Sequence, residues 1–171
     1  MAFTATVSVS HGTTECITTQ IGEDKRRYKM LGGCTVIISL FILGKMYVAN
    51  AGDSRCIVCR DGKAIEMSFD HKPEDEPELK RIEGAGGHVT PDGRVNGGLN
   101  LSRAIGDHLY KTNTSLPLTE QQISPVPDVR THTLDCKKDS FILLACDGIW
   151  NSMTSQEVAD FVQERLAKWD F

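Results

Sequence analysis

Two aspartates stand at the ends of apolar, strand-like segments. Asp53 follows residues 48–52, and Asp147 follows residues 141–146. A carboxylate at the end of a buried strand is held at the rim of a sheet, and Mg²⁺ and Mn²⁺ prefer oxygen ligands of this kind. The same pattern suits a turn, because Asp-Gly is a common turn dipeptide and an aspartate can cap the helix that follows it. The pattern alone therefore leaves metal binding and turn formation both open.

Other polar residues give weaker signals. Arg103 follows a strand-like stretch, and its guanidinium is shaped to grip phosphate, although a surface salt bridge is the commoner fate of one arginine. Cys56 and Cys59 form a CxxC, but residues three apart on a strand point to opposite faces, so we expect two unrelated strand cysteines. The histidines show no metal-ligand spacing and are expected on the surface or in loops: His11, His71, His88, His108 and His132.

The segments that must position these residues begin at Cys34. Four short stretches rich in apolar and β-branched residues predict strands at residues 34–43, 46–52, 54–60 and 63–68. Gly44-Lys45 and Asp61-Gly62 suit tight hairpin turns, so the four strands are predicted to form one antiparallel meander. Before them, the alternation in residues 4–10 is typical of a further strand.

Helices and loops are predicted between and after the strands. Residues 74–87 read as a short helix with Pro77 in its first turn. Thr154 and Glu157 form a capping box for a helix to about Lys168, with Val158, Phe161, Val162 and Leu166 on one apolar face. A turn is predicted at residues 91–93 and a buried strand at residues 141–146. Residues 111–127 are predicted to form a long polar loop, and loops of this length inside a compact domain are commonly functional. The class is α+β, with a mainly antiparallel sheet.

Composition limits the possible partners. The 171 residues carry a net charge of −4 and 40% hydrophobic residues, which is typical of one soluble globular domain. There is no polybasic tract that would favour nucleic acid or an anionic membrane. The longest apolar run, residues 36–43, is too short to span a bilayer, and the first residues lack a secretory pattern. We expect a soluble intracellular protein with no nucleic-acid or membrane partner.

Several strings, taken together and in order, resemble the metal-dependent Ser/Thr protein phosphatases of type 2C, the PPM family. They are GGCTV from Gly32, VANAGDSR from Val48, DHKP from Asp70, RIEGAGGHV from Arg81, RVNGGLNLSRAIGD from Arg94 and FILLACDGIW from Phe141. The resemblance covers roughly residues 31–162. Within the family, it is greatest to animal cytosolic and nuclear members, which implies a protein of the cytoplasm, the nucleus or both.

The resemblance implies a fold and a chemistry. The fold is a partial α-β-β-α sandwich of two antiparallel sheets flanked by helices. The complete family domain holds two core Mg²⁺ or Mn²⁺ ions, with a possible third ion, and a metal-bridging water hydrolyses phosphoserine and phosphothreonine in protein substrates. Asp147 resembles a core metal ligand, and Asp53 resembles the aspartate near the third ion. Residues 108–127 correspond to a flap beside the site, with Arg103 at its base facing substrate. The complete protein is expected to be monomeric.

This sequence also departs from the family pattern. The N-terminal arginine, acidic pair and Asp-Gly-His-Gly-Gly motif of the family are absent from residues 1–30, and its late Asp-Asn motif is not found after the final helix. No catalytic residue is therefore identified. We expect an atypical segment at residues 1–30 and a partial phosphatase domain at residues 31–171. This chain is then a weakly active or inactive fragment of a phosphatase. The alternative is a non-catalytic pseudophosphatase module that binds phosphoproteins or regulates a partner.

Overall fold

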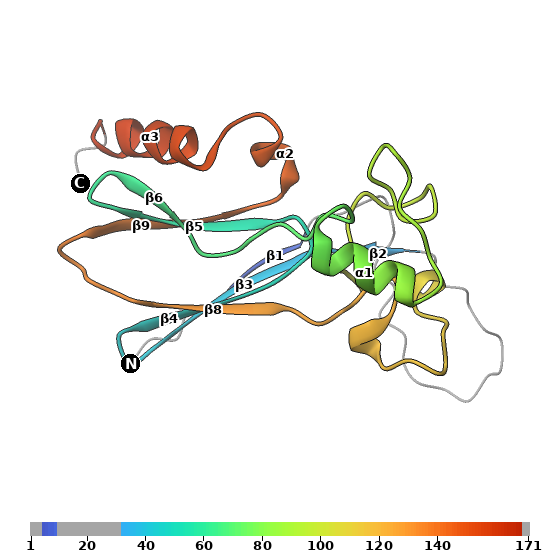
Figure 1. Ribbon diagram of the computed structural model, residues 1–171. Coiled ribbons are helices and arrows are strands. Elements are labelled where there is room, and N and C mark those ends of the chain that lie inside the picture. Colours follow the sequence, from blue (N-terminus) through green and yellow to red (C-terminus); the bar gives the residue numbers. More distant parts are fainter. Residues whose placement is uncertain (1–4, 10–31, 169–171) are drawn as a thin grey trace.

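The computed structural model describes residues 32–168 and the backbone of residues 5–9. Two antiparallel sheets are stacked on each other (Figure 1). The first has the strand order β1-β3-β4-β8 and the second the order β6-β5-β9. Their bounds are β1 Ala5–Val9, β3 Val36–Ile42, β4 Lys45–Ala51, β8 Asp128–Thr133, β6 Lys63–Glu66, β5 Arg55–Arg60 and β9 Asp139–Ala145.

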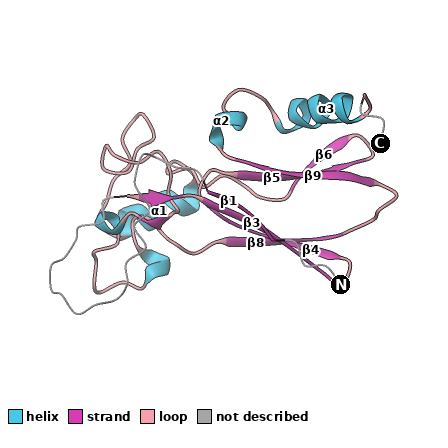
Figure 2. Ribbon diagram, turned by 180° about the vertical axis from the view of Figure 1, so that it is seen from behind, coloured by secondary structure: helices cyan, strands magenta, loops and turns pink. Residues whose placement is uncertain are grey.

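Helices lie outside the sheets and at one end of them. Helices α2 (Asp147–Trp150) and α3 (Ser155–Leu166) lie on the side of β5 and β9 that faces away from the first sheet (Figures 1 and 2). Helix α1 (Glu76–Gly84) lies at the end of the sheets, beside the paired strands β2 (Gly33–Cys34) and β7 (Ile105–Gly106) and the short turns η1 (His108–Tyr110) and η2 (Leu118–Glu120). None of the described helices is long and apolar enough to cross a membrane.

Two apolar clusters hold these layers together. Ile37, Met46 and Val48 of the first sheet pack against Cys56 and Val58 of the second. The opposite face of the second sheet is covered by the helices, in a cluster of Ile57, Cys59, Trp150, Val158 and Ala159. Cys56 and Cys59 therefore belong to different clusters on opposite faces of β5. The expectation of two unrelated strand cysteines is confirmed.

The four predicted strands form, but the single meander is wrong. Hairpins join β3 to β4 and β5 to β6, and the second turn has Asp61 and Gly62 at positive φ, as a type I′ turn requires. Between them the chain changes sheets, because the free side of β4 pairs with β8 instead of with β5. Residues 52–54 carry this crossing. Strand β8 was not predicted, since its sequence DVRTHT is polar.

The predicted helices are confirmed with one correction. Helix α1 has Pro77 in its first turn and ends at Gly84, and α3 begins with the capping box of Thr154 and Glu157. The apolar face of α3, however, is only partly covered: Val158 is buried, whereas Phe161 and Leu166 are 45% and 42% exposed. Phe161 packs instead against Arg165 of its own helix, whose guanidinium lies 3.3 Å from the ring centroid.

Candidate functional site

The register of β5 and β9 brings Asp53 and Asp147 to the same edge of the second sheet. The last pair of this antiparallel ladder is Arg55 with Ala145. Asp53 lies two residues before Arg55, and Asp147 lies two residues after Ala145. Because the two strands run in opposite directions, both aspartates lie beyond the ladder on the same side. This edge is the candidate site.

The turn that carries Asp53 depends on a glycine. Gly52 has a φ of +122°, and a Cβ at this position would come 2.3 Å from Cγ2 of Thr35. Only glycine fits this conformation and this close approach. The next residue, Asp53, is 5% exposed, and its Oδ2 accepts a hydrogen bond from Lys72 Nζ at 3.0 Å. The turn therefore presents a buried carboxylate that already has a cationic partner.

Two of the strings singled out in the sequence lie against each other here. The Arg55 guanidinium forms a two-point ion pair with Asp70, through Nε at 3.1 Å and Nη2 at 3.2 Å. The Gly52 N–H donates to His71 Nδ1 at 3.1 Å. Together with the hydrogen bond from Lys72 to Asp53, these interactions connect the GDSR segment to three consecutive residues of the DHKP segment, Asp70, His71 and Lys72. The junction fixes where the Asp53 turn lies.

His71 lies in the loop between β6 and α1, in line with the expectation of a surface or loop residue, but it is buried. This histidine is 4% exposed and not a surface residue. Its Nδ1 lies 3.1 Å from the Gly52 nitrogen and 3.0 Å from the Gly52 carbonyl oxygen, and its Nε2 lies 3.2 Å from Asp128 Oδ2, a carboxylate oxygen that accepts a proton donated by Nε2. His132, also expected on the surface or in a loop, lies on β8 and bonds to Asp139. Spacing between histidines carries no signal for either contact, since both partners are aspartates: Asp128 lies 57 residues after His71, and Asp139 lies seven residues after His132.

Behind the junction lies a buried ionic cluster. The Glu78 side chain on α1 is 5% exposed and accepts hydrogen bonds from Arg81, Arg103 and Ser102. Burial alone would raise the pKa of the Glu78 carboxyl, but these three donors outweigh burial and lower the pKa to about 2. Glu78 is therefore ionised at neutral pH and holds two arginines in place.

Arg103 belongs to this cluster. Its Nε and Nη2 donate to Glu78, and its Nη1 donates to Asp128 Oδ1 at 2.8 Å and to the Val126 carbonyl at 3.2 Å. Asp128 in turn accepts from His71, so a continuous path of hydrogen bonds runs from α1 to Gly52. In this arrangement the guanidinium is an ion-pair partner of Glu78 and Asp128, largely buried and not the surface salt bridge that the sequence left open, and it supports the Asp53 turn.

Asp147 has a different environment. It is the first residue of α2 and is partly exposed, and its Oδ2 accepts a long hydrogen bond from Asn151 Nδ2 at 3.5 Å. Within the part of the chain that the structure describes, Asp147 has no ion pair. The segment is anchored instead by Trp150, whose Nε1 donates to the Ala145 carbonyl at 2.7 Å and whose ring lies under Arg55. Asp147 is therefore the accessible carboxylate of the edge.

Asp53 and Asp147 each bring to this edge a carboxylate, the kind of ligand that divalent cations such as Mg²⁺ prefer. Mg²⁺ commonly uses one or two carboxylates and completes its shell with water and phosphate. They do not make a site for two adjacent ions, which repel each other and need more negative charge. Among residues 32–168, no group of three or more His, Cys, Asp and Glu side chains is placed to hold a metal ion. The described residues thus do not by themselves supply the ligands that a pair of ions needs.

Comparison with known proteins decides the family. The family model described as "Protein phosphatase 2C" matches residues 7–170. The chain belongs to the protein phosphatase 2C family. Protein phosphatase 1G of Rattus norvegicus is 59% identical over 138 residues, which are 81% of this chain and 25% of that protein. Probable protein phosphatase 2C 21 of Arabidopsis thaliana is 49% identical over 78% of this chain and 37% of that protein.

Solved structures agree with this placement. A crystal structure of a phosphatase from a pathogenic strain of Toxoplasma gondii matches with a TM-score of 0.64 and 32% identity, over 99% of this chain and 55% of that one. The α+β fold with two antiparallel sheets is that of the family. The chain spans about a quarter of the length of Protein phosphatase 1G.

Sequence reasoning missed the residues that support the aspartates. It quoted DHKP and RIEGAGGHV as strings but assigned no role to Asp70, His71 or Lys72, and it did not single out Glu78. One signal was available for Glu78: it lies one position from the partly buried Leu79 and four before Ile82, on the side of α1 that packs inward. A carboxylate there needs cationic partners.

Proposed function

We propose that this chain is the part of a metal-dependent protein phosphatase that carries the Asp53 and Asp147 ligands. The substrates are phosphoserine and phosphothreonine in proteins, and the cation is Mg²⁺ or Mn²⁺. The observation that carries the proposal is the shared edge: two carboxylates lie beyond the same end of the β5–β9 ladder, in a chain of the protein phosphatase 2C family. The expectations of a monomer, acting in the cytoplasm, the nucleus or both, belong to the same proposal.

The two aspartates have different tasks in this proposal. Asp147 is accessible and unpaired within the described residues, so it is the primary ligand. Asp53 is paired with Lys72, so a cation at this carboxylate must displace the ammonium group. A bound divalent cation would act as a Lewis acid on phosphate oxygens and would lower the pKa of a water molecule. The remaining residues of the edge orient the carboxylates: Gly52 and His71 fix the Asp53 turn, and Arg55 holds Asp70 and Trp150.

A chimera tests the proposal directly. Residues 32–168 of this chain would replace the matching residues of rat Protein phosphatase 1G, and hydrolysis of a phosphothreonine peptide would be measured with Mn²⁺ and with EDTA. The proposal predicts Mn²⁺-dependent turnover that Asp147→Asn lowers about a hundredfold or more. Glu164→Gln, which changes an exposed carboxylate on α3, is the matched control and should leave turnover unchanged. Turnover that is indifferent to Asp147 would refute its role as a ligand.

A second candidate function is a pseudophosphatase module that binds phosphoproteins without hydrolysing them. Two observations favour it: the described residues lack a cluster of three metal-ligating side chains, and Lys72 already neutralises Asp53. The same chimera separates the two functions. A folded chimera that binds the phosphopeptide but shows no Mn²⁺-dependent turnover supports the module and rejects the enzyme.

A further inference from the structure

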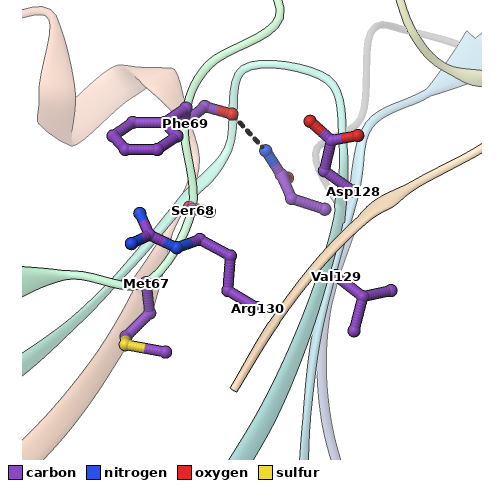
Figure 3. A pocket seen from close by; sticks show the side chains of 7 residues that line it. Met67, Ser68, Phe69, Asp128, Val129 and Arg130 are labelled. Atoms are coloured by element: carbon purple, nitrogen blue, oxygen red, sulfur yellow. Dashed lines mark hydrogen bonds between the residues drawn. The ribbon is translucent and has the colours of Figure 1, made fainter. Parts of the chain in front are cut away.

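Asp128 stands where the loop of residues 111–127 ends and β8 begins. The ladder between β4 and β8 pairs it with Asn50, which lies two residues before Gly52. The Asp128 side chain is 61% exposed and borders a pocket between β8 and the segment after β6 (Figure 3). Because exposed ion pairs contribute little to stability, the main effect of this carboxylate is to hold the groups that donate to it.

On one side, Asp128 is joined to the end of the loop through Arg103. Its Oδ1 accepts from Arg103 Nη1 at 2.8 Å, and the same Nη1 donates to the Val126 carbonyl at 3.2 Å. Arg103 and Ser124 also form a parallel bridge. The chain from Ser124 to Asp128 reads SPVPD, and its two prolines restrict φ. The end of the loop and the Asp128 carboxylate are therefore held to one another.

On the other side, Asp128 reaches the turn before Asp53 through His71. Its Oδ2 accepts from His71 Nε2 at 3.2 Å, and His71 Nδ1 lies 3.1 Å from the Gly52 nitrogen and 3.0 Å from the Gly52 carbonyl oxygen. The histidine is buried, so its ring has little freedom to turn away from Gly52. A shift of the Asp128 carboxylate therefore moves the His71 ring, and the ring moves the residue that precedes Asp53.

We propose that Asp128 is a positioning residue, which couples the loop of residues 111–127 to the affinity of Asp53 for a divalent cation. The inference rests on the proposed cation site and states how that site is regulated. Partners that orient a metal ligand commonly change metal affinity by about tenfold to a hundredfold, and the effect of Asp128 is smaller because it acts through His71 and Gly52. A ligand that displaces the end of the loop then changes cation affinity, and the cation changes the affinity for that ligand by the same factor.

The first test needs no metal. Asp128→Asn keeps one acceptor oxygen and replaces the other by an NH₂ group, so one of the two hydrogen bonds is lost. In ¹H–¹⁵N NMR spectra of the 171-residue chain, this change should shift the backbone amides of Gly52 and Asp53. Asp92→Asn is the matched control, because the Asp92 side chain is 68% exposed and lies 3.3 Å from an arginine, Arg94. It should leave both amides in place.

The second test is a Mn²⁺ titration of the same proteins, followed by electron paramagnetic resonance of the free ion. Asp128→Asn should weaken binding about threefold to tenfold, and Asp92→Asn should leave it unchanged. Pro127→Ala frees φ at the exposed residue before Asp128 and should weaken binding about twofold. A purely structural role of Asp128 would lower the urea midpoint and leave the Mn²⁺ affinity of the folded chain unchanged, which would overturn the inference.

The inference is also overturned if Asp128→Asn leaves the amides of Gly52 and Asp53 in place. Failure of the proposed function has a different signature: Asp147→Asn leaves Mn²⁺ binding unchanged, while the amide shifts of Asp128→Asn persist in the metal-free chain. In that outcome the cation site is rejected, and the link between Asp128 and the turn stands.

Discussion

Asp53 and Asp147 both follow an apolar strand, yet the structure builds two different sites around them. The Asp53 turn is buried and fixed by side chains from two other segments, through His71 and Lys72 of one and, further back, Arg103 of the other. Asp147 begins a four-residue helix and is anchored mainly by Trp150. Similar sequence patterns therefore give one rigid, compensated carboxylate and one accessible carboxylate. The rigidity of the Asp53 turn and the accessibility of Asp147 can therefore be altered by separate substitutions.

The largest effect is expected from the cluster that supports the Asp53 turn. Glu78→Gln removes the charge that compensates Arg81 and Arg103, and we expect the free energy of unfolding to fall by about 3–4 kcal/mol, because a buried charge loses its partner. Urea denaturation measures this. Glu76→Gln is the matched control on the same helix, since its ion pair with Lys80 is exposed; it should cost about 0.5 kcal/mol or less. Equal losses for the two variants would contradict the assigned role of the cluster.

Gly52→Ala tests the turn itself. A Cβ would lie 2.3 Å from Thr35 Cγ2 on a backbone with positive φ, so we expect a loss of about 2–3 kcal/mol in thermal or urea unfolding. Gly44→Ala is a control with φ +74° but with no atom within 4 Å of the added Cβ, and it should cost about 1 kcal/mol. Phe161→Ala removes an exposed side chain on α3, and it should lower the free energy of unfolding by less than either glycine substitution. If Gly52→Ala is as mild as Gly44→Ala, the turn is not fixed as described.

The same cluster predicts a dependence of stability on pH. The pKa of Glu78 is lowered from 4.5 to about 2 in the folded chain, so its ionised form stabilises the fold above pH 4.5. This contribution, about 2 kcal/mol after allowance for screening by solvent, should disappear as the pH falls from 4.5 toward 2. Urea unfolding of the unmodified chain and of Glu78→Gln across this range measures it. The difference between the two proteins should shrink with falling pH, and a constant difference would reject the assignment.

The features that could be predicted from the sequence are those that residues close together in the chain determine. The hairpin at Asp61-Gly62, the capping box of Thr154 and Glu157, and the opposite faces of Cys56 and Cys59 all follow from local geometry. The change of sheet after Ala51 did not, because it depends on β8, which is polar and lies far along the chain. The burial of Glu78 and His71 depends in part on distant partners: Ser102 lies 24 residues from Glu78, and Asp128 lies 57 residues from His71. For the same reason, the shared edge of Asp53 and Asp147 emerged only from the register of β5 with β9.

The most direct test of the central claim is a Mn²⁺ titration of the 171-residue chain, followed by electron paramagnetic resonance of the free ion. If the two aspartates form one cation site, the chain binds one Mn²⁺ in the millimolar range, and Asp147→Asn weakens binding about tenfold or more. Lys72→Met should strengthen binding about fivefold to tenfold, because the ammonium 3.0 Å from Asp53 no longer competes. Binding that ignores Asp147→Asn, or that Lys72→Met weakens in a folded chain, would contradict the account.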